Sequence, residues 1–364
     1  MFKPAPIDHI VHPLIRDRWS PRAFDDRPVS GAQLRRLFEA WRWAASCFNE
    51  QPWQVILARK EDGDAFNEML NCLAEANQRW ARDAAVLFIV VVHDTFVRNG
   101  KTNRYAAHDA GLALAQMSLQ AQAERMALHP MAGFDAEAVR ARYGVPDGYT
   151  PITAVALGYR AIPARMDPKL LASEETPRHR KARSEWLFAG RWGQTWSHPD
   201  EAQIEEVLRY WFGEVDAHGR SAPEVAQRWW QKDPAVDAEI RERFGSLLTR
   251  VHNHELTSWG DSARGRLALI LICDQFPRHI HRDTPDMFAM DARAQHLALT
   301  GLRLGLDESL GIDARLFFVL PLMHAESLRQ QAECLEYIRH LYRSAPNDVL
   351  RDHIRPYLEH ARQH

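Results

Sequence analysis

Two arginines and a serine occupy alternate positions in the stretch Arg18-Trp19-Ser20-Pro21-Arg22. In an extended chain alternate side chains share one face, so this stretch would present Arg18, Ser20 and Arg22 together. Two guanidinium groups beside a hydroxyl match a phosphate and a sugar-like hydroxyl chain. The same pattern also fits two solvated surface arginines around a turn proline. The stretch alone leaves both interpretations open.

A second polar stretch, Ala45-Ser46-Cys47-Phe48-Asn49-Glu50-Gln51, follows one helix downstream. Its hydroxyl and amide groups could form hydrogen bonds with the polar edge of a planar ring. The alternative is a turn that leads into a strand, which Pro52 supports. Cys47 lies inside this stretch, and without a neighbouring base a small buried residue is a better interpretation than a redox thiol.

Taken in order, the Arg-x-Ser-x-Arg-x-Phe stretch, the helix and the Ser-x-x-Asn-x-Gln-Pro-Trp segment resemble the opening of the flavin-dependent nitroreductase family. The resemblance continues through Asn77, the 105–111 segment, Gly133 and the 178–193 tail, and it covers about residues 12–196. Several motifs in the right order are far more specific than any one of them. One departure is visible, because Ala45 stands where the family has a proline before the serine.

The resemblance implies a site for FMN. The residues implied to bind it are Arg18, Trp19, Ser20, Arg22, Ala45, Ser46, Asn49, Gln51, Asn77, Ala132, Gly133, Arg180 and Lys181. The basic residues would hold the phosphate, the polar loop and Asn77 the ring edge, and the backbone at Ala132 and Gly133 the region of the reactive nitrogen. Asn77 could instead cap a helix end, and Gly133 could simply end a helix. Asp109 is interpreted as structural.

The resemblance also implies a reaction. NAD(P)H would reduce the flavin, its product would leave, and a nitroaromatic, quinone or similar small oxidant would be reduced at the same place by a ping-pong mechanism. No side-chain general acid is required, so no catalytic residue is named. We expect a homodimer with flavin at the subunit interface. The alternative is a flavin-binding or interaction protein with little turnover, whose helical half binds a partner.

The last part of the chain carries a different set of motifs. Asp274-Gln275-Phe276-Pro277-Arg278 follows an apolar helix, and Pro321-Leu322-Met323-His324-Ala325-Glu326 comes later. These motifs, with Trp211-Phe212, resemble a bacterial helical family of unknown function over about 204–364. The family usually extends further, so we expect an incomplete domain. His324, Glu326, Asp274 and Arg278 could converge as a polar pocket, or they could be buried polar groups that tie helices together. A hydrolytic site there would lack a nucleophile elbow or phosphate loop.

Composition sets the remaining bounds. The chain has 364 residues, a formal net charge of −2 and four cysteines without CxxC spacing. Two domains are therefore expected, and nothing indicates a nucleic-acid partner, a disulfide scaffold or a metal site. Without an apolar run approaching 18 residues, no membrane partner is expected, and the reduced cysteines favour the cytoplasm.

The sequence also predicts the helices and strands on which these motifs lie. Ser30 and Gln33 form a capping-box pattern that begins a helix. Residues 53–58, 85–92 and 153–159 read as strands, 66–80 as one amphipathic helix and 105–128 as a long buried helix. Asp135 would cap a short helix that ends at Tyr143. We predict an α+β nitroreductase-like domain at residues 1–196, with a central, mainly antiparallel sheet surrounded by helices. An all-α domain, open to a tetratricopeptide-like arrangement of helix pairs, follows at 204–364.

Overall fold

The computed structural model describes residues 3–162 and 168–363, and the chain divides into two compact units. The first unit comprises Met1–Ala5 and His12–Arg178, and the second comprises Pro6–Val11 and His179–His364. The N-terminal segment therefore lends six residues to the second unit, where His9 pairs with Ser262 in a β-bridge. The boundary expected between residues 196 and 204 stays a prediction.

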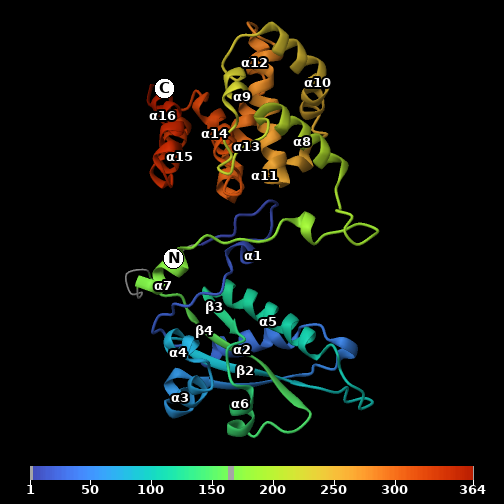
Figure 1. The fold of residues 1–364 in the computed structure, drawn as a ribbon, viewed down its shortest axis with the longest axis vertical. Helices are drawn as coiled ribbons and strands as arrows, with labels where there is room; N and C mark the ends of the chain where they lie inside the picture. The colour runs from blue at the N-terminus through green and yellow to red at the C-terminus, as the bar shows by residue number, and fades with distance from the viewer. Residues whose placement is uncertain (1–2, 163–167, 364) are drawn as a thin grey trace. The chain divides into compact units, whose positions relative to one another are not determined.

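The first unit is built on a four-stranded antiparallel sheet in the order β1-β2-β4-β3 (Figure 1). Its strands are β1 (Trp53–Arg59), β2 (Val86–His93), β3 (Met126–Met131) and β4 (Tyr149–Tyr159). β2 is buried along nearly all its length because it lies in the middle of the sheet and both of its faces are covered. This agrees with its continuous apolar sequence.

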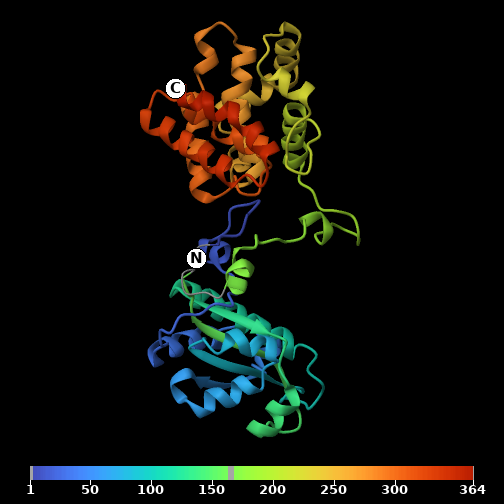
Figure 2. The same cartoon turned by 60° about the vertical axis from the view of Figure 1, so that its left-hand side comes forward.

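Helices cover both faces of this sheet (Figure 1 and Figure 2). On one face α2 (Gly31–Arg42) and α5 (Ala106–Ala123) enclose a core with Phe88, and on the other α3 (Asp64–Asn71), α4 (Glu75–Ala81) and α6 (Ala136–Tyr143) enclose a core with Leu87. The short helices α1 (Pro13–Asp17) and α7 (Pro168–Glu175) complete the unit, with 3₁₀ turns η1 (Cys47–Asn49) and η2 (Lys60–Asp62). The α+β prediction is confirmed.

Local signals set several of these elements. The Ser30 hydroxyl accepts from the Gln33 backbone N–H while the Gln33 side chain accepts from the Ser30 N–H, the reciprocal bonds of a capping box. The carboxylate of Asp135 accepts from the N–H of Ala138 and begins α6 as expected.

Two helix predictions were wrong. The helix expected at 105–128 ends at Ala123, and Met126–Met131 forms edge strand β3 against β4. The helix expected at 66–80 is broken between Asn71 and Glu75. Leu73 forms a β-bridge with Phe134 at this break. In both cases pairing with a distant segment outweighs local helical periodicity.

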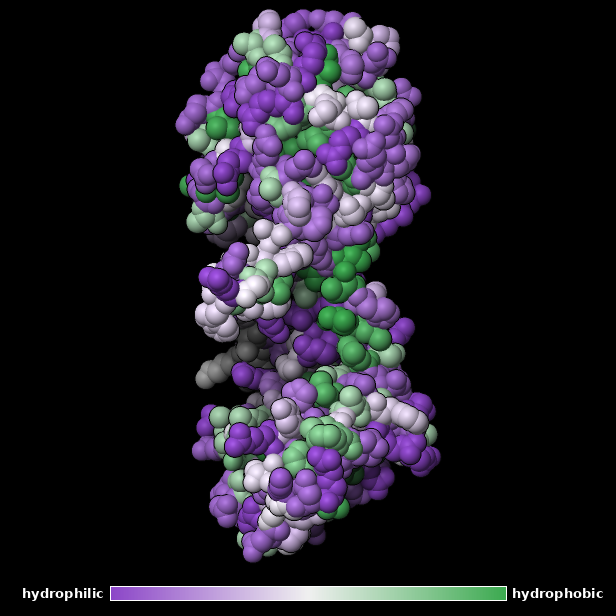
Figure 3. Space-filling model, turned by 90° about the vertical axis from the view of Figure 1, so that its right-hand side faces the viewer, coloured by the Kyte–Doolittle hydropathy of each residue, from purple (hydrophilic) through white to green (hydrophobic). Residues whose placement is uncertain are grey.

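The second unit is helical. Its α-helices are α8 (Pro199–Phe212), α9 (Pro223–Arg228), α10 (Pro234–His252), α11 (Ala263–Ile270), α12 (Phe276–Ile280), α13 (Asp291–Leu304), α14 (Ile312–Met323), α15 (Leu328–Ser344) and α16 (Asp348–Gln363). Its shorter turns are η4 (Arg183–Glu185), η5 (Thr257–Asp261), the π-helical η6 (Leu271–Gln275) and η7 (Pro285–Phe288). One core rich in leucine and aromatic side chains unites these helices. The face in Figure 3 is mostly hydrophilic on both units, as expected when each buries its own core. The all-α prediction is confirmed.

Candidate functional site

The Arg18–Arg22 stretch is fixed by a buried carboxylate. Glu174, on α7, is 5% exposed and accepts hydrogen bonds from the indole Nε1 of Trp19 at 3.1 Å and from the backbone N–H of Arg22 at 2.8 Å. Trp19 is buried, whereas the side chain of Arg22 is exposed. The stretch is therefore held by its backbone and its tryptophan, which leaves the Arg22 guanidinium in solvent.

The polar segment after β4 folds back onto the same stretch. The guanidinium of Arg178 donates to the carbonyl oxygens of Lys3, Arg16 and Arg18 at 3.1, 2.7 and 2.8 Å. The basic tail therefore begins beside Arg18, as a phosphate site built from both ends of this unit would require. Arg180 and Lys181, which were the residues expected there, are exposed, and their role at a phosphate stays a prediction.

Arg160 is partly buried beside this stretch. Its guanidinium stacks 4.0 Å from the ring of Trp19 and donates to the side chain of Gln122 near the end of α5. Its Nε is buried and has no hydrogen-bond partner. Burial, with the charge of nearby Arg18, lowers the pKa of Arg160 to about 10. The nearby carboxylates of Asp17 and Glu174 act in the opposite direction and partly offset this effect.

His129 connects the arginine stretch to Asn77's helix. Nδ1–H of His129, on β3, donates to the carbonyl oxygen of Pro21 at 2.9 Å, and its ring lies 4.6 Å from that of Trp80 on α4. Burial lowers the pKa of His129 from its ordinary value of 6.5, with a smaller contribution from the charge of Arg22. A neutral imidazole therefore links residue 21 to α4, the helix that carries Asn77.

Asn77 and Gly133 meet directly. The side-chain amide of Asn77 donates to the carbonyl oxygen of Gly133 at 2.9 Å, and the N–H of Ala74 donates to the same oxygen at 2.9 Å. A Cβ on residue 133 would lie 2.6 Å from Nδ2 of Asn77, so glycine is required by space. Asn77 lies inside α4 and is not the helix C-cap, while Ala132 beside this contact is exposed.

The Ser46–Gln51 loop is strained. Phe48, Asn49 and Gln51 all have positive φ angles of 55°, 58° and 49°, which are uncommon for residues with a Cβ. The hydroxyl of Ser46 accepts from the Gln51 N–H at 3.0 Å, and the Gln51 amide donates to the Asn49 carbonyl at 3.0 Å. Ala45, Asn49 and Gln51 are exposed. Strain of this kind is concentrated at functional sites, and it distinguishes the loop from an ordinary turn.

Asp109 anchors this loop. Its carboxylate is 2% exposed and accepts from the backbone N–H of Cys47 at 2.8 Å. Asp109 is in the first turn of α5, whereas Gln122, the partner of Arg160, is in its last turn. Thirteen helical residues span about 20 Å. In the described part of the chain, no hydrogen bond, ion pair or ring contact joins the loop to the Arg18–Arg22 stretch or to Asn77. Within one chain, the Ser46–Gln51 loop and the Arg18–Arg22 stretch are thus held at opposite ends of α5.

Three residues of this region were absent from the sequence expectations: Glu174, Arg160 and His129. Glu174 stands in a polar segment that carries no periodic signal. Arg160 directly follows an apolar strand, and a charged residue at the end of a strand is the one signal that could have drawn attention to it.

Of the four polar residues that could form a pocket in the helical unit, Asp274, Arg278 and His324 contact one another. Asp274 is 1% exposed, and its Oδ1 accepts from Nδ1–H of His324 at 2.9 Å. Arg278 and Asp291 form paired bonds of 2.9 and 3.1 Å. Burial alone would raise the pKa of Asp274, but His324 and Arg278 hold it below its ordinary value.

This network borders a cavity of about 590 Å³. The cavity is lined by Arg278, Phe288, Asp291, Ala292, Gln295, His324 and Glu326. Asp274 itself sits in the π-helical turn η6, a feature that is common at functional sites. The buried part of the network connects η6, α12 and α14, which fits the interpretation of polar groups that tie helices together. His324 and Glu326 also line the cavity, which fits the interpretation of a polar pocket.

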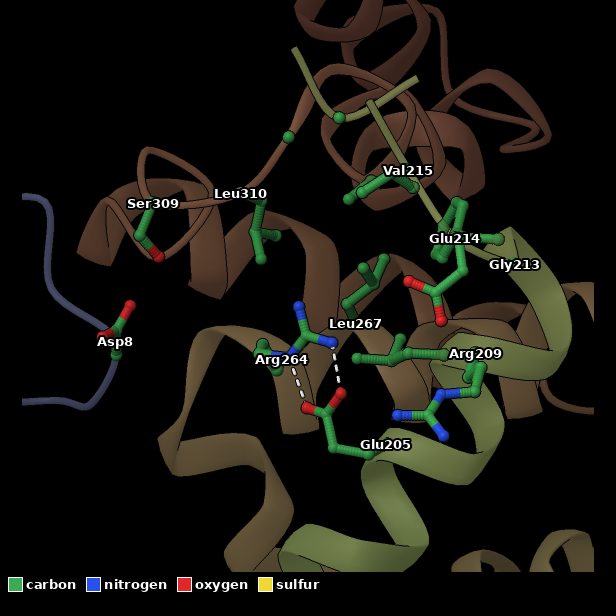
Figure 4. Close-up of a pocket in the computed structure, with 15 residues that line it drawn as sticks. Asp8, Glu205, Arg209, Gly213, Glu214, Val215, Arg264, Leu267, Ser309 and Leu310 are labelled. Carbon is green, nitrogen blue, oxygen red and sulfur yellow. Dashed lines mark hydrogen bonds and ion pairs between the residues drawn. The ribbon is translucent and has the colours of Figure 1, made fainter. Parts of the chain in front are cut away.

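A smaller pocket of about 270 Å³ lies elsewhere in the helical unit (Figure 4). Arg264, on α11, makes a two-bond ion pair with Glu205 of α8, while Arg209 and Glu214 also border the hollow. Asp8, from the N-terminal segment, completes its rim. Arg264 is neutralised and the remaining charges are mixed, so this pocket favours no particular ligand charge.

The described ranges contain no group of three His, Cys, Asp or Glu side chains that could hold a metal ion. No helix within those ranges has both the length and the apolar character needed to cross a membrane.

Comparison with family models identifies both halves of the chain. The nitroreductase family model matches residues 15–159, and the model of a bacterial protein family of unknown function, DUF924, matches residues 207–364. These matches contain the Arg18–Arg22 stretch, the strained loop, Asn77 and Gly133 in the first segment, and Asp274 and His324 in the second.

Individual proteins are similar to part of the chain. An uncharacterised 15.4 kDa protein of Mycolicibacterium smegmatis is 39% identical over 133 residues, 36% of this chain and 88% of that protein. A protein of Thermus thermophilus named NADH dehydrogenase is 27% identical over 175 residues, 40% of this chain and 83% of its own. A crystal structure described as an oxidoreductase containing FMN is 31% identical and covers 52% of this chain and 96% of its own, with a TM-score of 0.49.

Proposed function

Residues 15–159 belong to the nitroreductase family and residues 207–364 to the bacterial family of unknown function, and from this premise we propose an FMN-dependent oxidoreductase fused to a helical module. The chain is an oxidoreductase by its first family. The finer proposal is that it takes hydride from NAD(P)H and reduces a nitroaromatic, quinone or similar acceptor by a ping-pong mechanism. We also propose that residues 1–196 and 204–364 are its two domains.

The contact between Asn77 and Gly133, joined to the Arg18–Arg22 stretch through His129, carries this proposal. Gly133 packs directly against Asn77 where a side chain would stand, and the neighbouring Ala132 is exposed, so the backbone at residue 132 is accessible to a ring. The exposed Arg22 guanidinium is available to an anionic group, and partly buried Arg160, which stacks on Trp19, adds a second positive charge to this stretch. These features fit a phosphorylated, planar cofactor.

When bound, FMN would supply the two-electron redox chemistry. The chain's own residues would position it: Arg18 and Arg22 at the phosphate, and Asn77 with the backbone of residues 132 and 133 at the ring. Arg180 and Lys181 remain proposed phosphate ligands. Since no general acid is needed from a side chain, none is assigned.

The homodimer is part of the same proposal. The loop that contains Ser46, Asn49 and Gln51 is held at the opposite end of α5 from Arg160 and Trp19. A second copy of the chain would allow the loop of one subunit to complete the site of the other. The strain stored in the loop is consistent with a preformed binding segment.

An absorbance spectrum of the purified full-length protein tests this function. We expect a flavin spectrum that is bleached by NADH or NADPH without oxygen and restored by a quinone. A protein that contains flavin but is not bleached by either nucleotide would instead support the flavin-binding, low-turnover alternative. A colourless protein that takes up no added FMN would refute the cofactor assignment.

A further inference from the structure

The helical unit has a second large cavity, of about 540 Å³, on the other side of His324. It is lined by Trp230, Leu320, His324, Asp352, His353, Pro356, Tyr357 and His360. His324 also lines the cavity beside Arg278 and Asp291, so this imidazole is shared by both cavities. A cavity of several hundred cubic ångströms is large enough for a small organic ligand.

Aromatic side chains form part of the cavity wall. The rings of Trp230 and Tyr357 lie 6.1 Å apart at an angle of 63°. Trp230 is 61% exposed although it is a large apolar side chain, and its inner face packs against Phe317 at 6.1 Å. An exposed indole held in place from behind is a preformed surface on which a planar ring can stack.

Three histidines line the cavity, and a buried carboxylate orients two of them, His324 and His353. His324 donates through Nδ1 to Asp274, and His353 donates through Nε2 to Oδ1 of Asp313 at 2.5 Å. Asp274 and Asp313 are 1% and 0% exposed, so neither carboxylate can turn toward solvent. A carboxylate oxygen only accepts, so the ring nitrogen that faces it carries a proton. Nδ1 of His324 also lies 3.1 Å from Nη2 of Arg278, and the shorter contact to Asp274 is the one that assigns its proton. In each neutral imidazole the opposite ring nitrogen is then a hydrogen-bond acceptor.

Those opposite nitrogens, Nε2 of His324 and Nδ1 of His353, have no hydrogen bond within the described part of the chain. The hydroxyl of Tyr357 also has none there. The cavity therefore combines aromatic walls with oriented acceptors. Because no three metal-binding side chains converge among the described residues, the histidines do not form a metal site.

We propose that this cavity binds a planar aromatic molecule with an exchangeable proton, of the phenol class. The ring stacks on Trp230 beside Tyr357, and the hydroxyl donates a hydrogen bond to Nε2 of His324. This site is separate from the proposed flavin chemistry, because all its residues belong to the helical unit.

Phenol and cyclohexanol form a matched pair of probes, since they share size and hydroxyl and differ in planarity and acidity. Each is titrated into the full-length protein labelled at histidine Cε1, and the His324 and His353 resonances are followed by NMR after assignment with His324→Gln and His353→Gln. Phenol is expected to shift both resonances and to bind at least about tenfold more tightly than cyclohexanol, because only its planar ring can stack on the indole.

Trp230→Leu provides the second arm. Because Trp230 is largely exposed, this variant should fold, and phenol affinity should fall about tenfold or more. Trp192→Leu, at an indole that is 94% exposed and distant in sequence from the cavity, should leave affinity unchanged. Equal binding of the two probes, unchanged phenol affinity in Trp230→Leu, or phenol shifts no larger at His324 and His353 than at exposed His340 would each overturn the proposal.

Discussion

The side-chain amide of Asn77 donates to the carbonyl oxygen of Gly133 at 2.9 Å, and a methyl group on residue 133 would come within 2.6 Å of that amide nitrogen. Gly133→Ala must therefore push Asn77 away and break this bond. We expect the free energy of unfolding to fall by about 1–3 kcal/mol and bound flavin to be reduced. Denaturant unfolding and the ratio of flavin to protein absorbance measure both effects.

Gly245→Ala is the matched control for this substitution. Gly245 lies within α10, and a Cβ there would meet nothing within 4 Å. Replacing a helical glycine by alanine in open space is expected to stabilise by about 0.5–1 kcal/mol. If Gly133→Ala behaved like Gly245→Ala, close packing at Asn77 would not be required.

The arginine stretch can be tested by removing its charges. We expect the Arg18→Ala/Arg22→Ala double variant to lose flavin affinity by at least about tenfold, since hydrogen bonds to charged groups contribute about 1.5–3 kcal/mol each. Dialysis against FMN-free buffer followed by flavin absorbance measures retention. Arg82→Ala, at an exposed arginine on the C-cap of α4, should retain flavin. Normal retention in the double variant would remove the phosphate role from this stretch.

Much of the fold could be predicted because its signals are local. The capping box at Ser30 and the apolar runs of β2 and β4 depend on neighbouring residues, and both were identified correctly. β3 was missed because Pro130 argues against a strand. An edge strand tolerates proline, and only pairing with β4 makes the segment extended.

The candidate site also contains residues that sequence motifs identify and residues that only tertiary contacts reveal. Asn77 contacts Gly133. The family motif led us to expect both residues at the flavin ring, and that role stays a prediction. Glu174 could not be anticipated, since its hydrogen bonds to Trp19 and Arg22 span more than 150 residues of sequence. The role of Glu174 in holding the Arg18–Arg22 stretch is visible only from tertiary contacts, because no sequence periodicity or motif marks it.

The Ser46–Gln51 loop should depend on Asp109. Asp109→Ala would leave the backbone N–H of Cys47 without its acceptor, at a cost of about 1–3 kcal/mol. We expect the Cys47 thiol to react about tenfold faster with a chromogenic disulfide reagent, since 1.4 kcal/mol of loop opening corresponds to tenfold. Cys72, Cys273 and Cys334 are buried, so the fast phase belongs to Cys47. Adding Cys47→Ser should abolish that phase, and Asp109→Asn, which keeps an acceptor oxygen, should largely restore the slow rate.

Acid should destabilise the first unit through His129. Burial lowers the pKa of His129 below 6.5, so the unfolded chain binds this proton more readily than the folded chain. Its contribution to stability is complete above pH 6.5 and is lost as pH falls through the lowered value. We expect His129→Gln, whose amide can still donate to Pro21, to flatten the decline in unfolding free energy as the pH falls below 6.5.

The pH profiles of wild type and His129→Gln are compared by subtraction. Burial also lowers the pKa of His279 in the helical unit, and this second histidine is present in both proteins, so its effect cancels in the difference. Identical pH profiles for wild type and His129→Gln would show that protonation of His129 carries no such cost.

The network around Asp274 should be essential to the helical unit. Asp274→Ala removes the fully buried acceptor of His324 and leaves Arg278 with one carboxylate fewer, since Asp274 lies 3.4 Å from its guanidinium. Breaking a buried, charged network typically costs about 3–5 kcal/mol. We expect the calorimetric transition of the helical unit to move to much lower temperature. Glu326→Gln, at the exposed mouth of the adjoining cavity, should leave that transition in place. If Asp274→Ala unfolded at the wild-type temperature, Asp274 would not be required for the stability of the helical unit, and its remaining role would be in ligand binding.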